Sequence, residues 1–183
     1  MPPPPDPGDP SAAGDPHTPG LGGPHDPALP WPDLPPPPPA SSPAVRRSMQ
    51  GNRRRDTVPE LAVRRACHAL GLRYRVDAPL PLEGVRRRAD LLFPGARVAV
   101  FVDGCRWHGC PEHSREPRTN ADYWTAKLER NRRRDADTDA RLAAVGWMAL
   151  RAWEHEDPAV VAERVSATVG SRRRGGAGTV SAG

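Results

Sequence analysis

Proline constrains this chain more than any other residue, because it fixes its own backbone φ angle and cannot donate a backbone hydrogen bond. The chain has 183 residues and 25 prolines, and 18 of these prolines fall, together with five glycines, in residues 1–44. Such a segment is disfavoured in helices and in central strands. We therefore expect a disordered tail over 1–44, one folded domain over 45–170 and a second disordered tail over 171–183.

The first tail and the rest of the chain carry opposite charges. Residues 1–44 contain five Asp and no Lys or Arg, so they carry −5; the whole chain carries +5, and the remaining 139 residues therefore carry +10. A small basic domain is typical of proteins that bind a polyanion, most often nucleic acid. No run of 18 apolar residues occurs, which argues against a membrane span. Three cysteines, an odd and low number, favour metal ligation or reduced thiols, and we expect a cytoplasmic protein.

The apolar pattern predicts a mixed α/β domain with a sheet flanked by helices, in the order α-β-β-β-α-β-α. Thr57 and Glu60 fit a capping box at the start of the first helix, and Gly71 fits its end. Residues 77–88, rich in Pro, Gly and Arg, are expected to form a polar turn region. The expected elements are a helix from 57 to 70, strands over 72–76, 89–93 and 96–102, a helix from 119 or 120 to 145, a strand over 147–153 and a helix from 158 to about 170.

A segment rich in cysteine and histidine follows the most apolar of these strands. Cys105, Cys110 and His113 have the spacing C-x4-C-x2-H. Three such ligands within nine residues suit tetrahedral zinc, and the fourth ligand must come from elsewhere. His155, after the last strand, is favoured over His68, which lies within a helix. The alternative is a cysteine-bearing loop without a metal.

Asp90 lies inside an apolar strand, where a carboxylate is costly unless it is paired or binds a cation. A tight turn joins this strand to the next, so Asp90 and the end of the strand over 96–102 can converge. A carboxylate and a strand-end carbonyl group are hard oxygen ligands, which makes a Mg²⁺ site plausible. An Asp that faces solvent on an edge strand is the equal alternative.

The long helix carries polar residues within an apolar stripe. Helical spacing predicts one shared face for Trp124, Leu128, Asn131, Asp135, Leu142 and Val145. Asp135 is a candidate to orient His108, the histidine that the zinc ligands leave over, by accepting its second ring N–H group. A pair between Asp135 and a neighbouring arginine of the same helix is the alternative. For Glu60 the pattern favours the capping role over a role beside a metal ion.

Together these residues resemble the very short patch repair (Vsr) endonucleases, mismatch nickases with a restriction-endonuclease-like fold. The resemblance runs from about Ser48 to Glu156. Its motifs occur in the same order and at matching separations: Thr57-Val-Pro-Glu60, Asp90-Leu-Leu, Val100-Phe-Val-Asp-Gly-Cys-Arg-Trp-His-Gly-Cys-Pro, Tyr123-Trp124 with Asn131 to Asp135, and Gly146-Trp147 to Trp153-Glu154.

The resemblance implies a role for each matching residue. Asp90 and the backbone carbonyl of Val102 match the family's Mg²⁺ ligands, and Glu60 matches a Glu that holds metal-bound water, which reverses the preference from the pattern. His108 matches the general base and Asp135 the carboxylate that orients it. The residues that match the structural zinc site are Cys105, Cys110, His113 and His155.

The resemblance also implies a DNA wedge. Trp107 and Trp124 match aromatic residues that enter the base stack beside a T:G pair, and Met49 matches an apolar residue that enters from the minor groove. Arg106, which we expect to contact DNA, stands where the family usually has Phe, and Asn52 stands where an Ile-like residue is usual. Asp103 stands where some members have a catalytic His; it is expected to add a metal ligand or to weaken stabilisation of the leaving group.

The expected function is therefore that of a Mg²⁺-dependent endonuclease, a monomer that nicks double-stranded DNA 5′ to the T of a T:G mismatch left by deamination of 5-methylcytosine. The product would carry a 5′-phosphate, and other mismatch-repair proteins are expected partners. Two alternatives stay open. One is a nuclease of the same fold with another DNA target, which Arg106 and Asn52 favour. The other is a zinc-stabilised DNA-binding module without catalysis.

Overall fold

The computed structural model describes residues 34–39, 43, 55–113 and 119–177. The tail over 1–44 falls almost wholly outside these residues, and so do Met49 and Asn52. The described elements are α2 (Val58–Ala69), β1 (Arg75–Pro79), β2 (Arg88–Phe93), η2 (Pro94–Ala96), β3 (Val98–Asp103), α3 (Cys105–His108), α4 (Ala121–Ala144), β4 (Met148–Trp153) and α5 (Pro158–Ala177). Their order confirms the expected α/β pattern, with the short helices η2 and α3 added.

Four strands form one mixed sheet in the order β1-β2-β3-β4. The first three strands pair antiparallel, whereas β3 and β4 pair parallel, from Val98 opposite Met148 to Asp103 opposite Trp153. A parallel pair needs a crossover connection, which α4 supplies. Because of this parallel pairing, the residues that follow β3 and β4 leave the sheet at the same edge.

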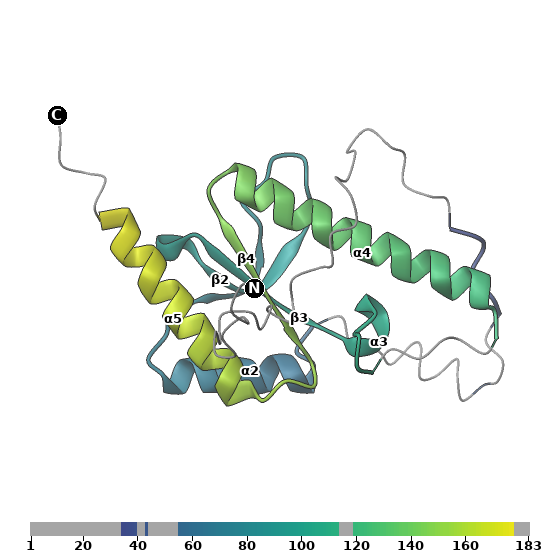
Figure 1. Cartoon of the computed structure of the whole chain (residues 1–183), viewed down its shortest axis with the longest axis horizontal. Helices are drawn as coiled ribbons and strands as arrows, with labels where there is room; N and C mark the ends of the chain where they lie inside the picture. Colours follow the sequence, from purple (N-terminus) through teal and green to yellow (C-terminus); the bar gives the residue numbers. More distant parts are fainter. Residues whose placement is uncertain (1–33, 40–42, 44–54, 114–118, 178–183) are drawn as a thin grey trace, which may run out of the picture.

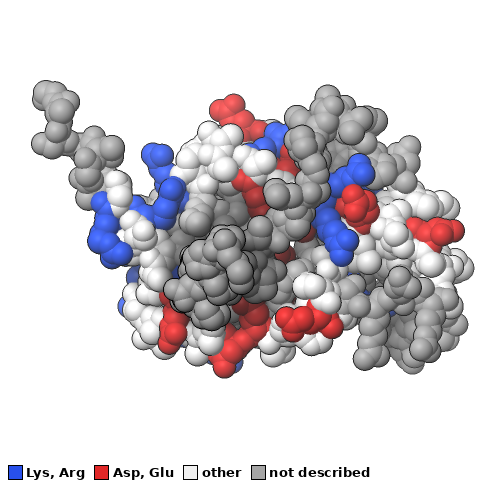
Figure 2. Space-filling view, viewed as in Figure 1, with Lys and Arg blue, Asp and Glu red and all other residues white. Residues whose placement is uncertain are grey.

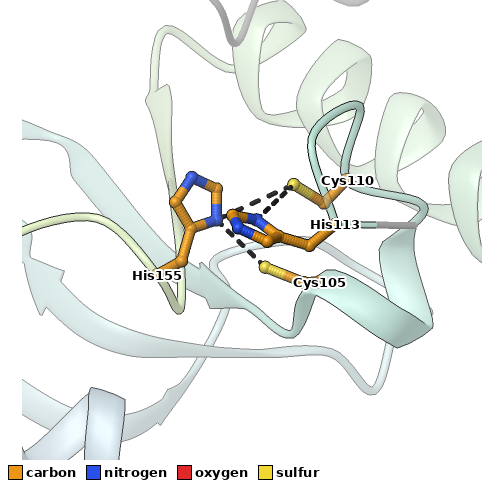
Figure 3. A group of neighbouring side chains, drawn as sticks. All are labelled: Cys105, Cys110, His113 and His155. Atoms are coloured by element: carbon orange, nitrogen blue, oxygen red, sulfur yellow. Dashed lines mark hydrogen bonds between the residues drawn. The ribbon is translucent and has the colours of Figure 1, made fainter. Parts of the chain in front are cut away.

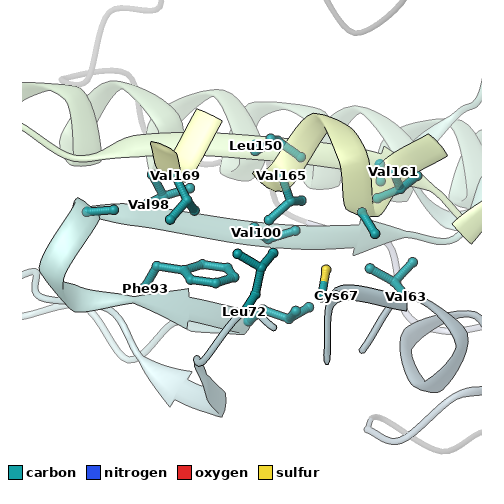
Figure 4. Close-up of a cluster of buried hydrophobic side chains, with 14 residues drawn as sticks. Val63, Cys67, Leu72, Phe93, Val98, Val100, Leu150, Val161, Val165 and Val169 are labelled. Carbon is teal, nitrogen blue, oxygen red and sulfur yellow. The ribbon is translucent and has the colours of Figure 1, made fainter. Parts of the chain in front are cut away.

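Alternating side chains of the sheet fill two cores, one on each face. On one face α2 and α5 cover a cluster that includes Phe93, Val100 and Val165 (Figure 4). On the other face Leu142 of α4 packs with Phe101 and Ala99. The sheet therefore lies between α2 and α5 on one side and α4 on the other (Figure 1).

Several element boundaries differ from those expected. The first strand spans Arg75–Pro79 rather than 72–76, so the turn region is shorter than the expected 77–88. The last helix continues to Ala177, well beyond residue 170, so residues 171–177 are helical rather than part of a tail. Val145 lies just after α4 with 48% of its surface exposed, so the apolar stripe of that helix ends at Leu142.

The first helix begins as expected but without the expected cap. Thr57 is the N-cap residue, yet its side chain makes no capping hydrogen bond. The Glu60 carboxylate instead accepts the backbone N–H of Asp56 at 2.9 Å and a hydrogen bond from Arg64 at 3.1 Å. Glu60 and Arg64 are both buried, so this carboxylate is held inside the protein rather than at the helix surface.

None of the helices among the described residues combines the length and the apolar character that crossing a bilayer requires.

Candidate active site and metal centres

The candidate site is built at the sheet edge where β3 and β4 end. Asp90 lies in the middle strand β2, and its carboxylate accepts the backbone N–H of Val102 at 2.7 Å. The β2–β3 ladder pairs Leu91 with Val100 as its last residues on this side, so the Asp90 side chain takes over a hydrogen bond that a backbone carbonyl would otherwise accept. Beside it, Asp77 in β1 has a φ of +43°, a backbone conformation that is rare for residues other than Gly. The sheet is thus distorted where the carboxylate enters it.

Negative charge accumulates around Asp90. Burial raises the pKa of Asp90 to about 6; the Val102 N–H opposes this effect, and the charges of Glu60 and Asp103 add to it. A divalent cation would relieve the same repulsion, because it attracts carboxylates that otherwise repel each other. The ligand types on hand, a carboxylate and a strand-end carbonyl, are the hard oxygens that Mg²⁺ prefers. Asp90, the Val102 carbonyl and Glu60 therefore fit a Mg²⁺ site chemically.

His108 and Asp135 lie together. His108 ends the short helix α3, Asp135 lies in α4, and the His108 Nδ1 is 2.6 Å from an Asp135 carboxylate oxygen. Because an ionised carboxylate only accepts hydrogen bonds, Nδ1 carries a proton, and in the neutral form of the ring Nε2 is the nitrogen with the lone pair. Burial alone would raise the pKa of Asp135, but the hydrogen bond with His108 and the charge of Arg151 lower it below its usual value. The pair thus has the geometry of a histidine base with an orienting carboxylate.

Helix α4 also holds the backbone on both sides of His108. The Asn131 side chain donates to the Trp107 carbonyl at 2.7 Å, and Arg132 donates to the Gly109 carbonyl at 3.1 Å. Gly109 has a φ of +69°, and a Cβ atom there would lie 2.3 Å from the Arg132 guanidinium. At the other end of α3, the Glu154 carboxylate accepts the Cys105 backbone N–H at 2.8 Å.

The four candidate zinc ligands converge in space (Figure 3). Cys105 and Cys110 lie on either side of His108, and the parallel pairing of β3 with β4 brings His155 to them. The Cys105 sulfur is 3.0 Å from the His155 Nδ1, and the Cys110 sulfur is 3.7 Å from the Nδ1 atoms of both His113 and His155. A tetrahedron built with Zn–S of about 2.3 Å and Zn–N of about 2.1 Å has edges of roughly 3.5 Å. The two 3.7 Å distances match these edges and the 3.0 Å distance is shorter, so the cluster has the ligand types and approximate spacing of a tetrahedral metal site.

Other features of the cluster also suit a metal. His155 Nε2 lies 3.6 Å from a carboxylate oxygen of Glu112, the type of outer partner that orients a metal-bound histidine. His68, the alternative ligand, is exposed in α2 and lies outside the cluster. The third cysteine, Cys67, is fully buried in the apolar core.

An aromatic surface lies beside His108. The Trp107 and Trp124 rings are 5.8 Å apart between centroids, and Tyr123 packs edge-on against Trp124. Two cations cover these rings: the Arg106 guanidinium lies 5.8 and 5.9 Å from the two tryptophan centroids, and the Lys127 ammonium lies 5.3 and 5.2 Å from them. Stacking rings among cations suit the binding of nucleic-acid bases and phosphates.

Two residues of this region are not among those predicted from the sequence. Lys127 is the only lysine of the chain, and its spacing of three residues from Trp124 along a helix was the signal that could have found it. Arg151 lies in β4 and contacts three acidic residues. Its neighbours in the sequence do not mark it as a site residue, because these three acids lie in β3 and α4.

Positive charge is also present on the surface of α4. Arg130, Arg132 and Arg134 are exposed there, and Figure 2 shows blue side chains over this helix and at the end of α5. Arginine side chains on the helix that carries Asp135 are suited to contact a phosphate backbone.

The sequence of the chain is similar to those of known DNA endonucleases. Residues 41–114 match the family model described as DNA mismatch endonuclease Vsr. The chain is 51% identical over 112 residues to the type II nicking enzyme V.NaeI of Lentzea aerocolonigenes, an alignment that covers 61% of this chain and 68% of the relative. It is 42% identical to the type II nicking enzyme V.NmeDIP of Neisseria meningitidis serogroup C, covering 61% and 74%. It is 32% identical to the DNA mismatch endonuclease Vsr of Escherichia coli, covering 59% and 67%.

Proposed function

The chain belongs to the Vsr family of DNA mismatch endonucleases, and from this premise we propose that it is a Mg²⁺-dependent nickase that cuts one strand of duplex DNA 5′ to the T of a T:G mismatch. That it is an endodeoxyribonuclease follows from the family. The strand that is cut, the requirement for a T:G mismatch and the identity of the metal are proposed. The observation that carries it is the 2.6 Å contact between His108 and Asp135, at the same end of the sheet as the partly buried carboxylate of Asp90.

In the proposed mechanism His108 acts as the general base. Its Nε2 lone pair takes a proton from the attacking water while Asp135 accepts the Nδ1 hydrogen bond and stabilises the positive charge that develops on the ring. The water oxygen forms a bond to phosphorus and the bond from phosphorus to the 3′ oxygen breaks. The departing 3′ oxygen takes a proton from solvent water and becomes a 3′-hydroxyl group, and the other end of the nick carries a 5′-phosphate. Mg²⁺, held by Asp90 and the Val102 carbonyl with Glu60 nearby, would neutralise charge on the scissile phosphate.

The sulfur and nitrogen cluster of Cys105, Cys110, His113 and His155 is proposed to be a structural zinc site. The fit of its distances to a tetrahedron supports this assignment. All four protein ligands are present, so such a site is closed and leaves no position for substrate.

Trp107 and Trp124 are proposed to wedge beside the mismatch, with Arg106 and Lys127 on the adjacent phosphates. Opening a base step at a mismatch costs less free energy than opening one between matched pairs, so a wedge prefers mismatched DNA. Met49 would complete the wedge from the minor groove. Since its substrate is DNA, the protein is proposed to act in the cytoplasm. It is proposed to act as a monomer and to meet other repair proteins at the lesion.

One observation favours a second target. Arg106 places a guanidinium, rather than an apolar ring, next to Trp107, and a cation binds phosphate on any duplex. A nickase that does not require the mismatch would use the same catalytic groups. Two relatives are named type II nicking enzymes, a name that does not mention a mismatch, and this supports the alternative.

The test uses end-labelled duplexes that carry T:G, matched C:G or another mismatch, incubated with the protein and Mg²⁺. A nick only in the T strand of the T:G duplex is the expected result, whereas equal cutting of matched DNA would favour the second target. Binding without any cutting would refute the catalytic proposal. His108→Ala should abolish nicking and keep the zinc content, while His68→Ala, which removes an exposed histidine outside the site, should leave both unchanged.

A further inference from the structure

Asp103 ends β3 between the Asp90 carboxylate and the His108 ring, and it is 6% exposed. Arg151, in the parallel neighbour strand β4, reaches it from the side. The Arg151 Nη1 lies 3.0 and 2.8 Å from the two carboxylate oxygens of Asp103. Both oxygens of Asp103 are therefore engaged by one guanidinium nitrogen.

The same guanidinium serves two acids of α4. Its Nε lies 3.0 Å from an Asp139 oxygen, and its Nη2 lies 3.4 Å from an Asp135 oxygen. Its central carbon sits 4.7 Å from the centre of the Phe101 ring, which fixes the plane of the guanidinium. Only 14% of the Arg151 side chain is exposed. One buried cation thus joins three carboxylates from two elements.

His108 Nδ1 has two carboxylates within reach. Asp135 is at 2.6 Å and Asp103 is at 3.6 Å. A single N–H group makes one strong hydrogen bond, so the two carboxylates compete for it. With its oxygens on Arg151, Asp103 is a weak competitor. Without Arg151, Asp103 would be a buried, unpaired carboxylate whose nearest donor is the imidazole.

We propose that Arg151 is a positioning residue, which holds Asp103 away from the imidazole so that Asp135 alone receives the Nδ1 hydrogen bond of His108. The proposal rests on the role of His108 as the base. The ring orientation that Asp135 imposes aims Nε2 away from α4. A ring turned toward Asp103 would aim Nε2 elsewhere and lose the attacking water. Arg151 therefore acts on the reaction through the direction of the His108 ring.

The experiment is a mutant cycle on nicking kinetics with the full chain. Arg151→Met removes the guanidinium and keeps most of the apolar volume, and Asp103→Asn removes the competing charge. Arg151→Met is expected to lower kcat about 10- to 100-fold, as the loss of partners that orient a ligand typically does, with KM changed less than about threefold. Adding Asp103→Asn to Arg151→Met is expected to recover at least about tenfold of that loss.

A matched control separates positioning from stability. Arg87 pairs with the buried Asp137 of α4 at 2.6 Å, away from His108, so Arg87→Met breaks a similar ion pair on the same helix. It is expected to lower the melting temperature while keeping kcat. An equal loss of kcat in Arg87→Met would overturn the proposal, as would unchanged kcat in Arg151→Met or a double variant no faster than Arg151→Met.

Two further arms complete the design. If Arg151→Met unfolds at the assay temperature, Arg151→Lys replaces it, since a lysine has a single nitrogen in place of the three with which Arg151 reaches its three acids. A loss of kcat that Asp103→Asn recovers supports the proposal, and a loss that it does not recover refutes it. His108→Ala is assayed alongside. If that variant nicks like the unaltered protein, the proposed role of His108 fails, whatever the Arg151 variants show.

Discussion

Replacing Asp90 by Asn should make the protein more stable and inactive at once. Asp90 is a partly buried carboxylate whose pKa is raised from 3.8 to about 6 by desolvation and by nearby acids. At neutral pH the Asp90 carboxylate of the folded protein is therefore ionised, although its surroundings favour the protonated form. An amide of the same shape carries no charge and can still accept the Val102 N–H through its oxygen.

The magnitude follows from this pKa. A change from 3.8 to about 6 corresponds to about 3 kcal/mol, at about 1.4 kcal/mol per pH unit. The buried NH₂ group of Asn offsets part of the gain, so we expect a net stabilisation of about 1–3 kcal/mol. For a domain of this size, that raises the melting temperature by roughly 3–15 °C.

Because the pKa of Asp90 is raised on folding, the pH range over which Asp90 affects stability is known. A carboxyl group with a raised pKa in the folded state favours folding while it is protonated, and this contribution is lost as the pH rises from about 4 through about 6. Asp90→Asn and the unaltered protein should therefore melt together near pH 4 and separate above pH 6. Asp135→Asn is the matched control, because the pKa of Asp135 is lowered below 3.8; its contribution to stability is lost only below about pH 4, so that variant should stay less stable than the unaltered protein from pH 4 to 8.

The assay is thermal unfolding followed by circular dichroism from pH 4 to 8, first in EDTA and then in 10 mM Mg²⁺. Mg²⁺ should stabilise the unaltered protein by about 1.4 kcal/mol if its dissociation constant is near 1 mM, and should not stabilise Asp90→Asn. Equal melting temperatures of the two proteins at pH 7.5 in EDTA, or a difference that does not vary with pH, would refute the reasoning.

Three further outcomes are expected. Gly109→Ala should cost about 1–2 kcal/mol in thermal unfolding, because φ is positive and Arg132 occupies the space of a Cβ atom, whereas Gly95→Ala, with open space around it, should cost less. Thiol titration with a chromogenic disulfide should detect no cysteine in the zinc-loaded protein and two after chelation, because loss of the metal would release Cys105 and Cys110, whereas Cys67 stays fully buried in the apolar core, outside the cluster. DNA affinity, measured by fluorescence anisotropy, should fall at least about tenfold between 50 and 200 mM salt; an affinity independent of salt would contradict binding through the arginines.

The parts of the fold that the sequence predicted are those with a strong local signal. The apolar run of β3, the long amphipathic α4 and the Asp-Pro start of α5 each depend on residues that are neighbours in the chain. The first strand lies later in the chain than predicted. Asp77, with its left-handed backbone, interrupts the alternation of the strand, and residues predicted to form a turn are paired with β2.

The cysteine cluster was predictable for a similar reason. Two cysteines and a histidine lie within nine residues, and the fourth ligand follows the strand that pairs with theirs. The ion-pair network of Arg151 was not predictable, since it joins residues 103, 135 and 139 across the sheet and a helix. In a chain with 26 arginines, no single arginine stands out in the sequence.

The position of His108 depends on groups outside its own helix. A helix of four residues such as α3 does not hold its shape in isolation, because nucleating a helix costs more than one turn returns. Its start is held by Glu154, its end by Asn131 and Arg132, and its flanks by Cys105 and Cys110. Loss of a metal from the cysteine cluster would release both flanks and move a histidine that is not itself a ligand. The proposed zinc site and the proposed base are thus mechanically linked through one turn of helix, and metal content and nicking should decline together.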